Sequence, residues 1–283
     1  MITSSKQPAL PGSRAIPAPN AQPLPSKVRR WAAKASRITG GTLIVMVALG
    51  WVGLQVQPAP FPAVARPAAP PATIGLPAGL PAPVERFYRV TYGEQIPIIK
   101  TAVVSGRGTM RLFGVAVPIR FRFTHEVGQN YRHQVDLTFF GLPLTTGYET
   151  FIDGHGWGKT PGGVDEGLGF DQGSNVSLWA EALNWFPAIL ATDPRVRWEP
   201  VDDTTALLRI PFGERQDVMV VRFDRENGKV QYVEAMKYNS ATHTPMLWIS
   251  GTWFHQGKPW LRLNVEDIVY NVPVDMSLAA KGP

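Results

Sequence analysis

Between Arg37 and Arg66 the chain carries 28 consecutive residues without a charge, and the first of them are strongly apolar. Isoleucine, valine, leucine and methionine dominate residues 38–56. A helix rises about 1.5 Å per residue, so this stretch is just long enough to cross a hydrocarbon layer of roughly 30 Å. We therefore predict a transmembrane helix over residues 38–56.

The charges on either side of this stretch predict its orientation. Every ionisable residue before it is basic, and the first acidic residue of the chain is Glu85. Basic residues favour the cytoplasmic side of a membrane. We expect a single-pass protein of the cytoplasmic membrane, with residues 1–37 as a basic, disordered cytoplasmic arm and the chain after the span outside the cytoplasm. Cleavage after Ala65 and a buried globular helix are the alternatives, but the long arm and the intervening prolines favour a retained anchor.

Residues 57–84 are rich in proline and alanine and predict a stalk. Proline fixes φ and favours an extended chain, so this segment is expected to act as a spacer between the membrane and a folded domain. A ligand for a proline-binding domain is the alternative. Residues 85–283 remain, which is the size of one ordinary domain.

The chain has a net charge of +6 and contains no cysteine. The basic excess lies before Glu85, where it would face the anionic inner leaflet, and this placement argues against nucleic-acid binding. The absence of cysteine excludes disulfides, thiol catalysis, cysteine-ligated metal and a lipidated cysteine.

Beyond Glu85 the apolar residues alternate, as in strands with one buried face. Residues 117–123 show this most clearly, with Arg120 and Arg122 on the opposite face from the apolar side chains. Turn signals separate the strands, and the strongest is Asn227-Gly228. We predict a mainly β (α+β) domain, built as a large curved antiparallel sheet or incomplete barrel. Further strands are expected around residues 135–139, 219–223, 247–253 and 261–269.

One interval, residues 175–191, shows helical spacing instead. Asn175 or Ser177 would serve as its amino-terminal cap, and Pro187 should kink or divide it. We expect this helix to pack across one face of the sheet, and a shorter helix is predicted over residues 83–92. The apolar positions of the longer helix are Trp179, Ala182, Leu183, Phe186 and Leu190.

The order of several motifs over residues 78–270 resembles a known family. The motifs are LPAPVERFYRV, GTMRL, YETFIDGHGWG, LWAEALNWFPAIL and VRWEPVDDTTALLRI. They resemble an uncharacterised, domain-of-unknown-function family of bacterial membrane-anchored proteins. That family in turn resembles the LolA and LolB lipoprotein carriers in plan, which implies an incomplete antiparallel barrel with helices plugging its open side. A fold does not fix a function, so the resemblance implies architecture.

Histidines offer the main chemistry to consider. His125 and His133 fall at the two ends of a predicted hairpin, so they would face one another, and exposed sheet surface is favoured over a shared metal. His155 follows Asp153 closely enough for the carboxylate to orient it, although the glycines around it are better explained by a turn with positive φ. We predict no catalytic residues, no metal ligands and no cofactors.

Aromatic residues give a better indication of function, because seven of the nine tryptophans follow the predicted span. Tryptophan suits surfaces that are half apolar and half wet, such as the mouth of a cavity, with core packing as the alternative at each position. Candidates to line a ligand cavity are Trp157, Trp179, Leu183, Phe186, Trp248 and Trp253.

These observations predict a non-enzymatic, membrane-anchored domain that binds or carries an apolar or amphipathic, lipid-like ligand in the cell envelope. Its partners would be the membrane, the ligand and other envelope proteins. The first alternative is a protein-interaction module of the envelope with a filled core. The second is a hydrolase-like enzyme centred on Asp153 and His155.

Overall fold

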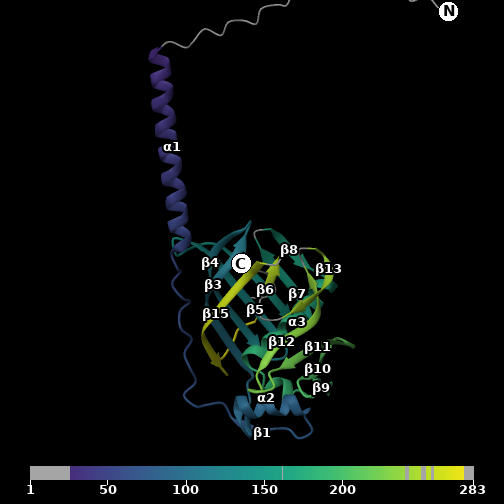
Figure 1. The fold of residues 1–283 in the computed structure, drawn as a ribbon. Helices are drawn as coiled ribbons and strands as arrows, with labels where there is room; N and C mark the ends of the chain where they lie inside the picture. The colour runs from purple at the N-terminus through teal and green to yellow at the C-terminus, as the bar shows by residue number, and fades with distance from the viewer. Residues whose placement is uncertain (1–25, 161, 240–241, 250–252, 256–257, 277–283) are drawn as a thin grey trace, which may run out of the picture. The chain divides into compact units, whose positions relative to one another are not determined.

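The computed structural model describes residues 26–160, 162–239, 242–249, 253–255 and 258–276 (Figure 1). It divides into two compact units, Met1–Leu49 and Gly50–Pro283. Most of helix α1 (Ser26–Gln55) belongs to the first unit. Within α1, the stretch Lys34–Gln55 is long and apolar enough to cross a membrane. Its large apolar side chains are exposed, as in a helix that needs a lipid environment to cover it.

The second unit is built from antiparallel strands, which confirms the mainly β prediction. An eight-stranded sheet contains, in spatial order, β14 (Trp253–His255), β15 (Lys258–Tyr270), β3 (Thr101–Leu112), β4 (Val115–Glu126), β5 (Asn130–Phe139), β6 (Leu142–Ile152), β7 (His155–Thr160) and β8 (Gly163–Glu166). A five-stranded sheet contains β13 (Thr244–Ile249), β12 (Val230–Asn239), β11 (Arg215–Phe223), β10 (Thr205–Phe212) and β9 (Arg197–Pro200). A small pair consists of β1 (Thr73–Gly75) and β2 (Gln95–Pro97).

Most strands follow the chain as hairpins, with turns where the sequence predicted them. Gly128 has φ 73° between β4 and β5, Gly213 has φ 56° between β10 and β11, and Gly228 has φ 68° before β12. These positive φ values are the conformations that glycine adopts most readily. β15 then returns from the end of the chain to pair with β3.

The strand predicted around residues 247–253 is wrong in two respects. Its residues divide between β13 and β14, which belong to different sheets. Leu247, which the alternation placed on a buried face, is exposed and lies opposite the exposed Met236. The context of a strand decides which of its two faces is buried. β13 is an edge strand whose outward face carries apolar residues, so the alternation of its sequence predicted the wrong buried face.

Besides the end of α1, the described part of the second unit contains the helices α2 (Ala82–Tyr92), α3 (Leu168–Trp185) and α4 (Ile189–Thr192). The shorter predicted helix is confirmed as α2, and Pro187 separates α3 from α4 as expected. The predicted caps are wrong, because α3 begins at Leu168 and both Asn175 and Ser177 are buried inside it. Tertiary partners satisfy them: Asn175 donates to the Pro211 carbonyl at 3.0 Å, and Ser177 accepts from Lys237 at 2.6 Å.

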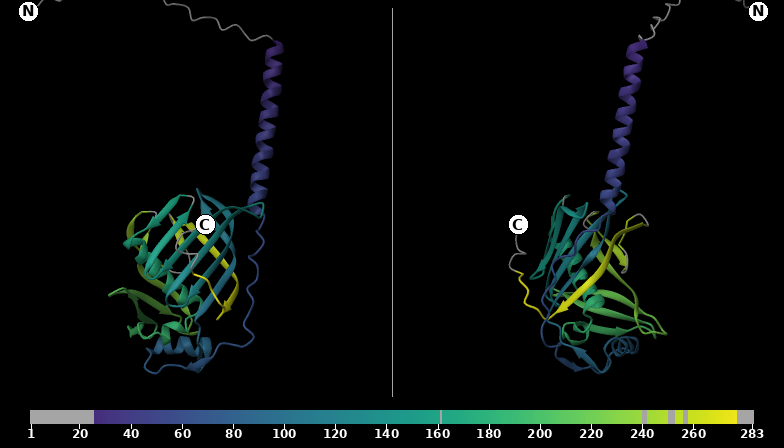
Figure 2. Two further views of the ribbon diagram at one scale, coloured as in Figure 1. Left: turned by 180° about the vertical axis from the view of Figure 1, so that it is seen from behind. Right: turned by 90° about the vertical axis from the view of Figure 1, so that its left-hand side faces the viewer.

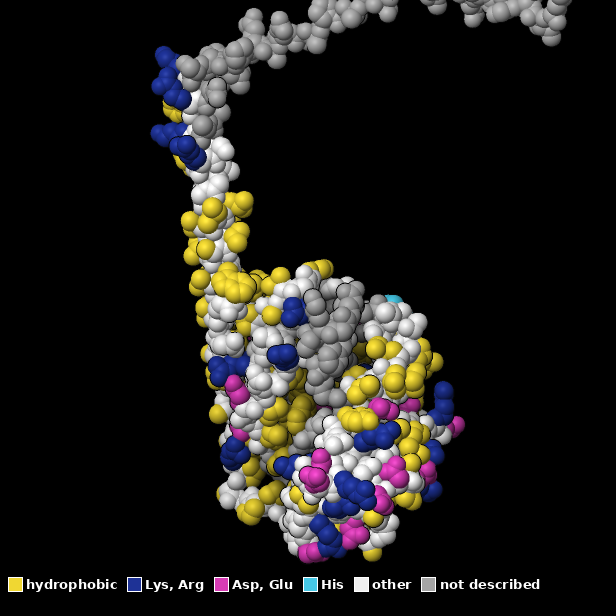
Figure 3. Space-filling model, in the orientation of Figure 1, with side chains coloured by type: hydrophobic (Ala, Val, Ile, Leu, Met, Phe, Trp, Pro, Cys, Tyr) yellow, Lys and Arg dark blue, Asp and Glu magenta, His cyan; other side chains and the backbone are white. Residues whose placement is uncertain are grey.

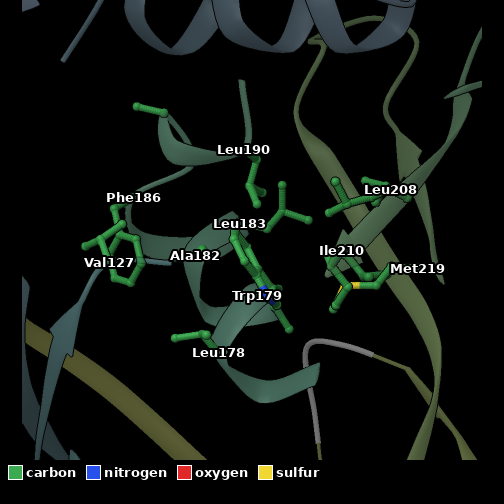
Figure 4. Close-up of a cluster of buried hydrophobic side chains, with 14 of the residues drawn as sticks. Val127, Leu178, Trp179, Ala182, Leu183, Phe186, Leu190, Leu208, Ile210 and Met219 are labelled. Carbon is green, nitrogen blue, oxygen red and sulfur yellow. The ribbon is translucent and has the colours of Figure 1, made fainter. Parts of the chain in front are cut away.

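Helix α3 lies between the two sheets and contacts β7 on one side and β12 on the other (Figures 1 and 2). Its apolar face forms the centre of the main core. Figure 4 shows Trp179 and Leu183 directed toward Leu208, Ile210 and Met219 of the five-stranded sheet. We call the face of the eight-stranded sheet that meets α3 its inner face, and the opposite one its outer face.

The proline-rich segment after α1 runs along the outer face rather than away from the domain (Figure 2). The Phe61 ring lies beneath the guanidinium groups of Arg120 and Arg122, at 4.4 and 4.8 Å from its centroid. Both arginines also donate hydrogen bonds to carbonyl groups of the segment. We call residues 57–72 the strap. The predicted domain limits, including a spacer over 57–84, stay predictions, but the structure gives this segment contacts that a free spacer lacks.

Candidate functional site

Two histidines and a glutamate meet inside the domain where α3 crosses the inner face. His125 of β4 is fully buried and His133 of β5 is 7 % exposed. The Glu181 carboxylate of α3 lies with Oε2 at 3.0 Å from His133 Nε2 and 3.4 Å from His125 Nε2. The two histidines therefore face one another as predicted, but the expectation of an exposed sheet surface is wrong. We call these three residues the polar cluster.

The register of the β4–β5 hairpin brings the imidazoles together. Phe123 pairs with His133, and His125 pairs with Tyr131, so all four side chains lie on the inner face. His133 is stacked between the rings of Phe123 and Tyr131, at centroid distances of 3.9 and 4.1 Å. A ring clamped on both faces keeps its nitrogens in a fixed direction, toward Glu181.

Two further charged groups surround the polar cluster. Lys237 of β12 reaches across from the other sheet and donates to Ser177 of α3. Glu149 of β6 accepts a hydrogen bond from the Tyr131 hydroxyl at 2.5 Å. Among the described residues, the surroundings of the polar cluster thus include the carboxyl groups of Glu149 and Glu181 and the ammonium group of Lys237, an arrangement that an ordinary apolar core avoids.

Burial shifts the pKa values of these groups strongly. Burial lowers the pKa of His125 to about 3 and that of His133 to about 4. Burial raises the pKa of Glu181 to about 7 and lowers the pKa of Lys237 to about 8. A low dielectric disfavours the charged form of each group, so both imidazoles are neutral at neutral pH. Neutral imidazoles keep a lone pair for a ligand.

His125 is the least satisfied member of the polar cluster. Neither of its ring nitrogens has a hydrogen-bond partner among the described residues, although the side chain is fully buried. A buried polar atom without a partner costs about 1–3 kcal/mol. The protein therefore holds an imidazole in a position that its own described groups do not satisfy.

An apolar surface continues the inner face beyond the polar cluster. Phe123 contacts both His133 and Phe121, so the two surfaces join without a break. Apart from Trp185, which also packs against the main core, this group is distinct from the main core around Trp179, and several of its side chains are only half-buried. We call it the apolar wall. Its members are Val104, Phe121, Phe123, Val135, Trp185, Leu263 and Ile268.

A set of exposed apolar side chains marks one end of the eight-stranded sheet. The β3–β4 and β5–β6 turns lie at this end, because the β4–β5 turn between them lies at the other. The Phe140 amide donates to the Gly53 carbonyl, in the last turn of α1, at 2.9 Å. Figure 3 shows hydrophobic side chains gathered here. We call this set the rim, and its members are Phe113, Phe140, Leu142 and Leu144.

The six predicted cavity residues are spread over different parts of the domain. Trp179, Leu183 and Phe186 are buried in the main core. Trp248 is half-buried on β13, where the Lys237 ammonium lies 5.8 Å from its ring centroid. Trp248 thus lies beside the Lys237 ammonium, and the Phe186 ring packs against His125 of the polar cluster, with centroids 5.0 Å apart. A role of the six residues in lining a cavity stays a prediction. Trp253 lies on β14, and its side chain is outside the described residues.

Trp157 lies on the outer face, because its neighbours Gly156 and Gly158 face α3. A pocket of about 390 Å³ lies elsewhere, between residues 66–72 of the strap and residues 268–271. It includes none of the predicted cavity residues.

The structure does not bring Asp153 and His155 together with a third polar group. The His155 side chain is 83 % exposed, and its nearest carboxylate is that of Asp171, at 3.7 Å. Asp153 occupies the turn itself, with φ 50°. Neither residue is held in a cleft, as a general base and its orienting group would be.

The glycines of this motif serve two purposes. Gly154 forms the turn with φ 85°, as predicted. Gly156 instead permits α3 to approach β7, since a Cβ there would lie 2.7 Å from Ser174 Oγ and 2.8 Å from Phe170 Cδ1. A Cβ at Gly158 would likewise lie against the phenyl ring of Phe170. Close packing, rather than turn geometry, explains the second and third glycines.

Sequence reasoning missed Glu181 and Lys237. Both interrupt an otherwise apolar pattern: Lys237 follows Val233 and Ala235 on the inward side of β12, and Glu181 lies among the apolar residues of α3. A charged residue at a position where periodicity requires an apolar one is the signal that would have found them.

The domain is a two-sheet antiparallel fold with an enclosed helix and a polar cluster in its interior. The chain belongs to a family of unknown function, DUF6544, whose model matches residues 71–254. The predicted membership of a domain-of-unknown-function family is thus confirmed. Among curated proteins, none matches the chain.

Two solved structures are similar to this one. A LolA superfamily protein from Nitrosomonas europaea has 10 % identity and a TM-score of 0.37, over 69 % of this chain and 96 % of that one. A DUF1329 family protein from Desulfovibrio piger has 11 % identity and a TM-score of 0.33, over 71 % of this chain and 97 % of that one. The LolA superfamily is the group whose plan the sequence resembled.

Proposed function

We propose that this protein is anchored in the cytoplasmic membrane by residues 38–56, and that its extracytoplasmic domain binds an amphipathic, lipid-like ligand. The observation that supports this most directly is that the apolar wall and the polar cluster are adjacent on the inner face of the eight-stranded sheet. One inner surface offers half-buried apolar side chains at one end and charged groups at the other. An amphipathic molecule has the same two parts.

The ligand's apolar part would lie along Val135, Leu263 and Ile268, which are half-buried. Its polar part would reach Glu181, whose side chain keeps 18 % of its surface exposed. Lys237 adds a positive charge from the facing sheet, so an anionic head group would find a partner at this depth. The role is binding or carriage, without bond cleavage.

The rim supports uptake from the membrane. It lies at the end of the sheet where Phe140 is hydrogen-bonded to Gly53, close to the end of the predicted span. Phe113 is fully exposed and Leu142 is 71 % exposed there, and exposed apolar patches of this kind mark contact surfaces. A ligand entering at this end of the sheet would therefore pass the rim before it reached the apolar wall.

Mass spectrometry of lipids that co-purify with the full-length chain tests the proposal. Val135→Lys would place a charge on the apolar wall, and we expect it to remove the bound lipid. Gln134→Lys on the same strand is the matched control, because this side chain lies on the outer face beside Asp136 and should leave the lipid in place. Equal lipid content in the two variants, or none specific to the wild-type chain, would refute the proposal.

A protein-interaction module is the second candidate. The five-stranded sheet exposes Met236, Leu247 and Ile249 on its outward side, and the core under α3 is filled by large side chains. An exposed apolar edge is a common docking site for another protein. Crosslinking in membranes from cells expressing Leu247→Lys would distinguish the two, since only an interaction module would lose its crosslinked partner.

A further inference from the structure

We propose that His125, His133 and Glu181 bind one divalent transition-metal ion of the zinc type, with a fourth position left open. Two imidazoles and one carboxylate are a ligand set that zinc accepts in proteins. The inference does not depend on lipid binding, because it rests on the polar cluster alone.

Two of the three distances within the polar cluster, those to Glu181, are close to those around a tetrahedral ion. All three ligand atoms lie within 4.8 Å of one another. Atoms bound about 2.1 Å from a tetrahedral zinc ion lie about 3.4 Å apart. Glu181 Oε2 lies 3.0 Å from His133 Nε2 and 3.4 Å from His125 Nε2. Small shifts of Glu181 would give both edges their ideal length.

A separate observation also points to a ligand at this place. His125 is fully buried, and neither of its nitrogens has a hydrogen-bond partner in the part of the chain that the structure describes. Side chains of this kind are normally satisfied by protein, water or a metal. A metal bound at Nε2 would satisfy the nitrogen that faces Glu181.

The ligand types favour zinc over calcium or magnesium. Calcium and magnesium prefer sets made of oxygen atoms, whereas imidazole suits zinc and its neighbours in the first transition row. The ligands come from two paired strands and from α3, which fixes them in the fold. Glu181 is partly exposed, so an ion would have a way in and an open coordination position.

The charge of the surroundings is compatible with a bound dication. Among the described residues next to the polar cluster, Glu149 contributes a second carboxyl group and Lys237 an ammonium group. The ammonium donates a hydrogen bond to Ser177, on the preceding turn of α3 from Glu181. A dication would complete a set of mostly opposite charges.

Zinc titration of the full-length chain in detergent, after treatment with a chelator, tests the site. We expect one ion per chain by calorimetry, and a tetrahedral absorption spectrum when cobalt replaces zinc. Glu181→Gln keeps the side-chain volume and should weaken zinc binding by more than about tenfold, the smaller loss seen even for residues that only orient a ligand. His155→Gln is the matched control and should bind zinc like the wild type, because His155 is exposed and remote from the polar cluster.

Thermal unfolding shows whether each variant is folded, so that loss of zinc binding is not confused with loss of structure. Zinc should raise the Tm of the wild type and of His155→Gln, but not that of a folded Glu181→Gln. Absence of saturable zinc binding by the wild type overturns the proposal, as does wild-type affinity in Glu181→Gln. Lipid content is measured separately on the metal-free chain. Failure of the zinc proposal can then be distinguished from failure of the lipid-binding proposal.

Discussion

The approach of α3 to β7 can be tested with two glycines on the inner face of the same sheet. A Cβ at Gly156 would lie 2.7 Å from Ser174 Oγ and 2.8 Å from Phe170 Cδ1. A Cβ at Gly147 on β6 would meet nothing closer than the Lys159 carbonyl oxygen, at 3.6 Å. Neither glycine has a positive φ, so alanine is compatible with the backbone at both positions.

The magnitude follows from two opposing effects. Replacing glycine by alanine reduces the freedom of the unfolded chain and stabilises the folded state by about 0.4–1 kcal/mol where the space allows it. We expect this gain in full for Gly147→Ala. Overpacking costs about 1–3 kcal/mol, so Gly156→Ala should be less stable than Gly147→Ala by that amount, since the unfolded-state effect is common to both.

Urea unfolding of the full-length variants in detergent, followed by tryptophan fluorescence, measures the difference. For a unit of this size, 1 kcal/mol corresponds to about 2–4 °C in Tm, so calorimetry provides a second estimate. If Gly156→Ala proved as stable as Gly147→Ala, α3 would not lie as close to β7 as the structure places it. The position of Glu181 against the histidines would then lose its support, because the same helix carries it.

Two further predictions concern the strap and the rim. Phe61→Ala removes both cation–π contacts and should lower the free energy of unfolding by about 1–2 kcal/mol in urea; unchanged stability would mean that the strap is not docked. Phe113→Trp places a reporter on the rim, and in bilayers of brominated lipid we expect more fluorescence quenching than in the wild type. Quenching equal to that of the wild type would mean that the rim does not lie at the membrane surface.

The strands could be predicted from the sequence because their pattern is local. Phe121 and Phe123 alternate with Arg120 and Arg122, and a two-residue period needs no knowledge of the rest of the chain. The phase of β13 was not accessible in this way. Whether Leu247 or Trp248 faces inward is decided by the pairing with Met236 and by the sheet's other face, neither of which the segment itself encodes.

The start of α3 was missed for a different reason. Its first residues contain Gly169 and Gly173, which disfavour a helix by about 1 kcal/mol each and resemble a loop. Both glycines lie against Tyr238, where a Cβ at Gly169 would be 2.6 Å from the ring. Side chains at these two positions would interfere with the packing of β12 against α3. Tertiary packing therefore overrides the local preference, and the helix extends through both glycines.

The polar cluster could be predicted only in part. The hairpin turn at Gly128 indicates that His125 and His133 face one another, and this was correct. Their burial depends on α3, which contributes Glu181 from a distant part of the sequence. A histidine pair on a predicted hairpin gives no sign of the helix that will cover it, so an exposed surface was the natural expectation.

The position of the polar cluster between two apolar groups argues that it binds something. Burying a polar side chain costs free energy unless it is hydrogen-bonded, so packing alone gives no reason for His125, His133 and Glu181 to lie between the main core and the apolar wall. Rules of packing are broken mainly where a site is built. His125, which its described neighbours leave without a hydrogen bond, is the member that packing explains least. Both proposed ligands would bind next to His125. A metal ion would bind the two imidazoles directly. The lipid-like ligand would lie on the apolar wall beside them, with its polar part at the Glu181 carboxylate.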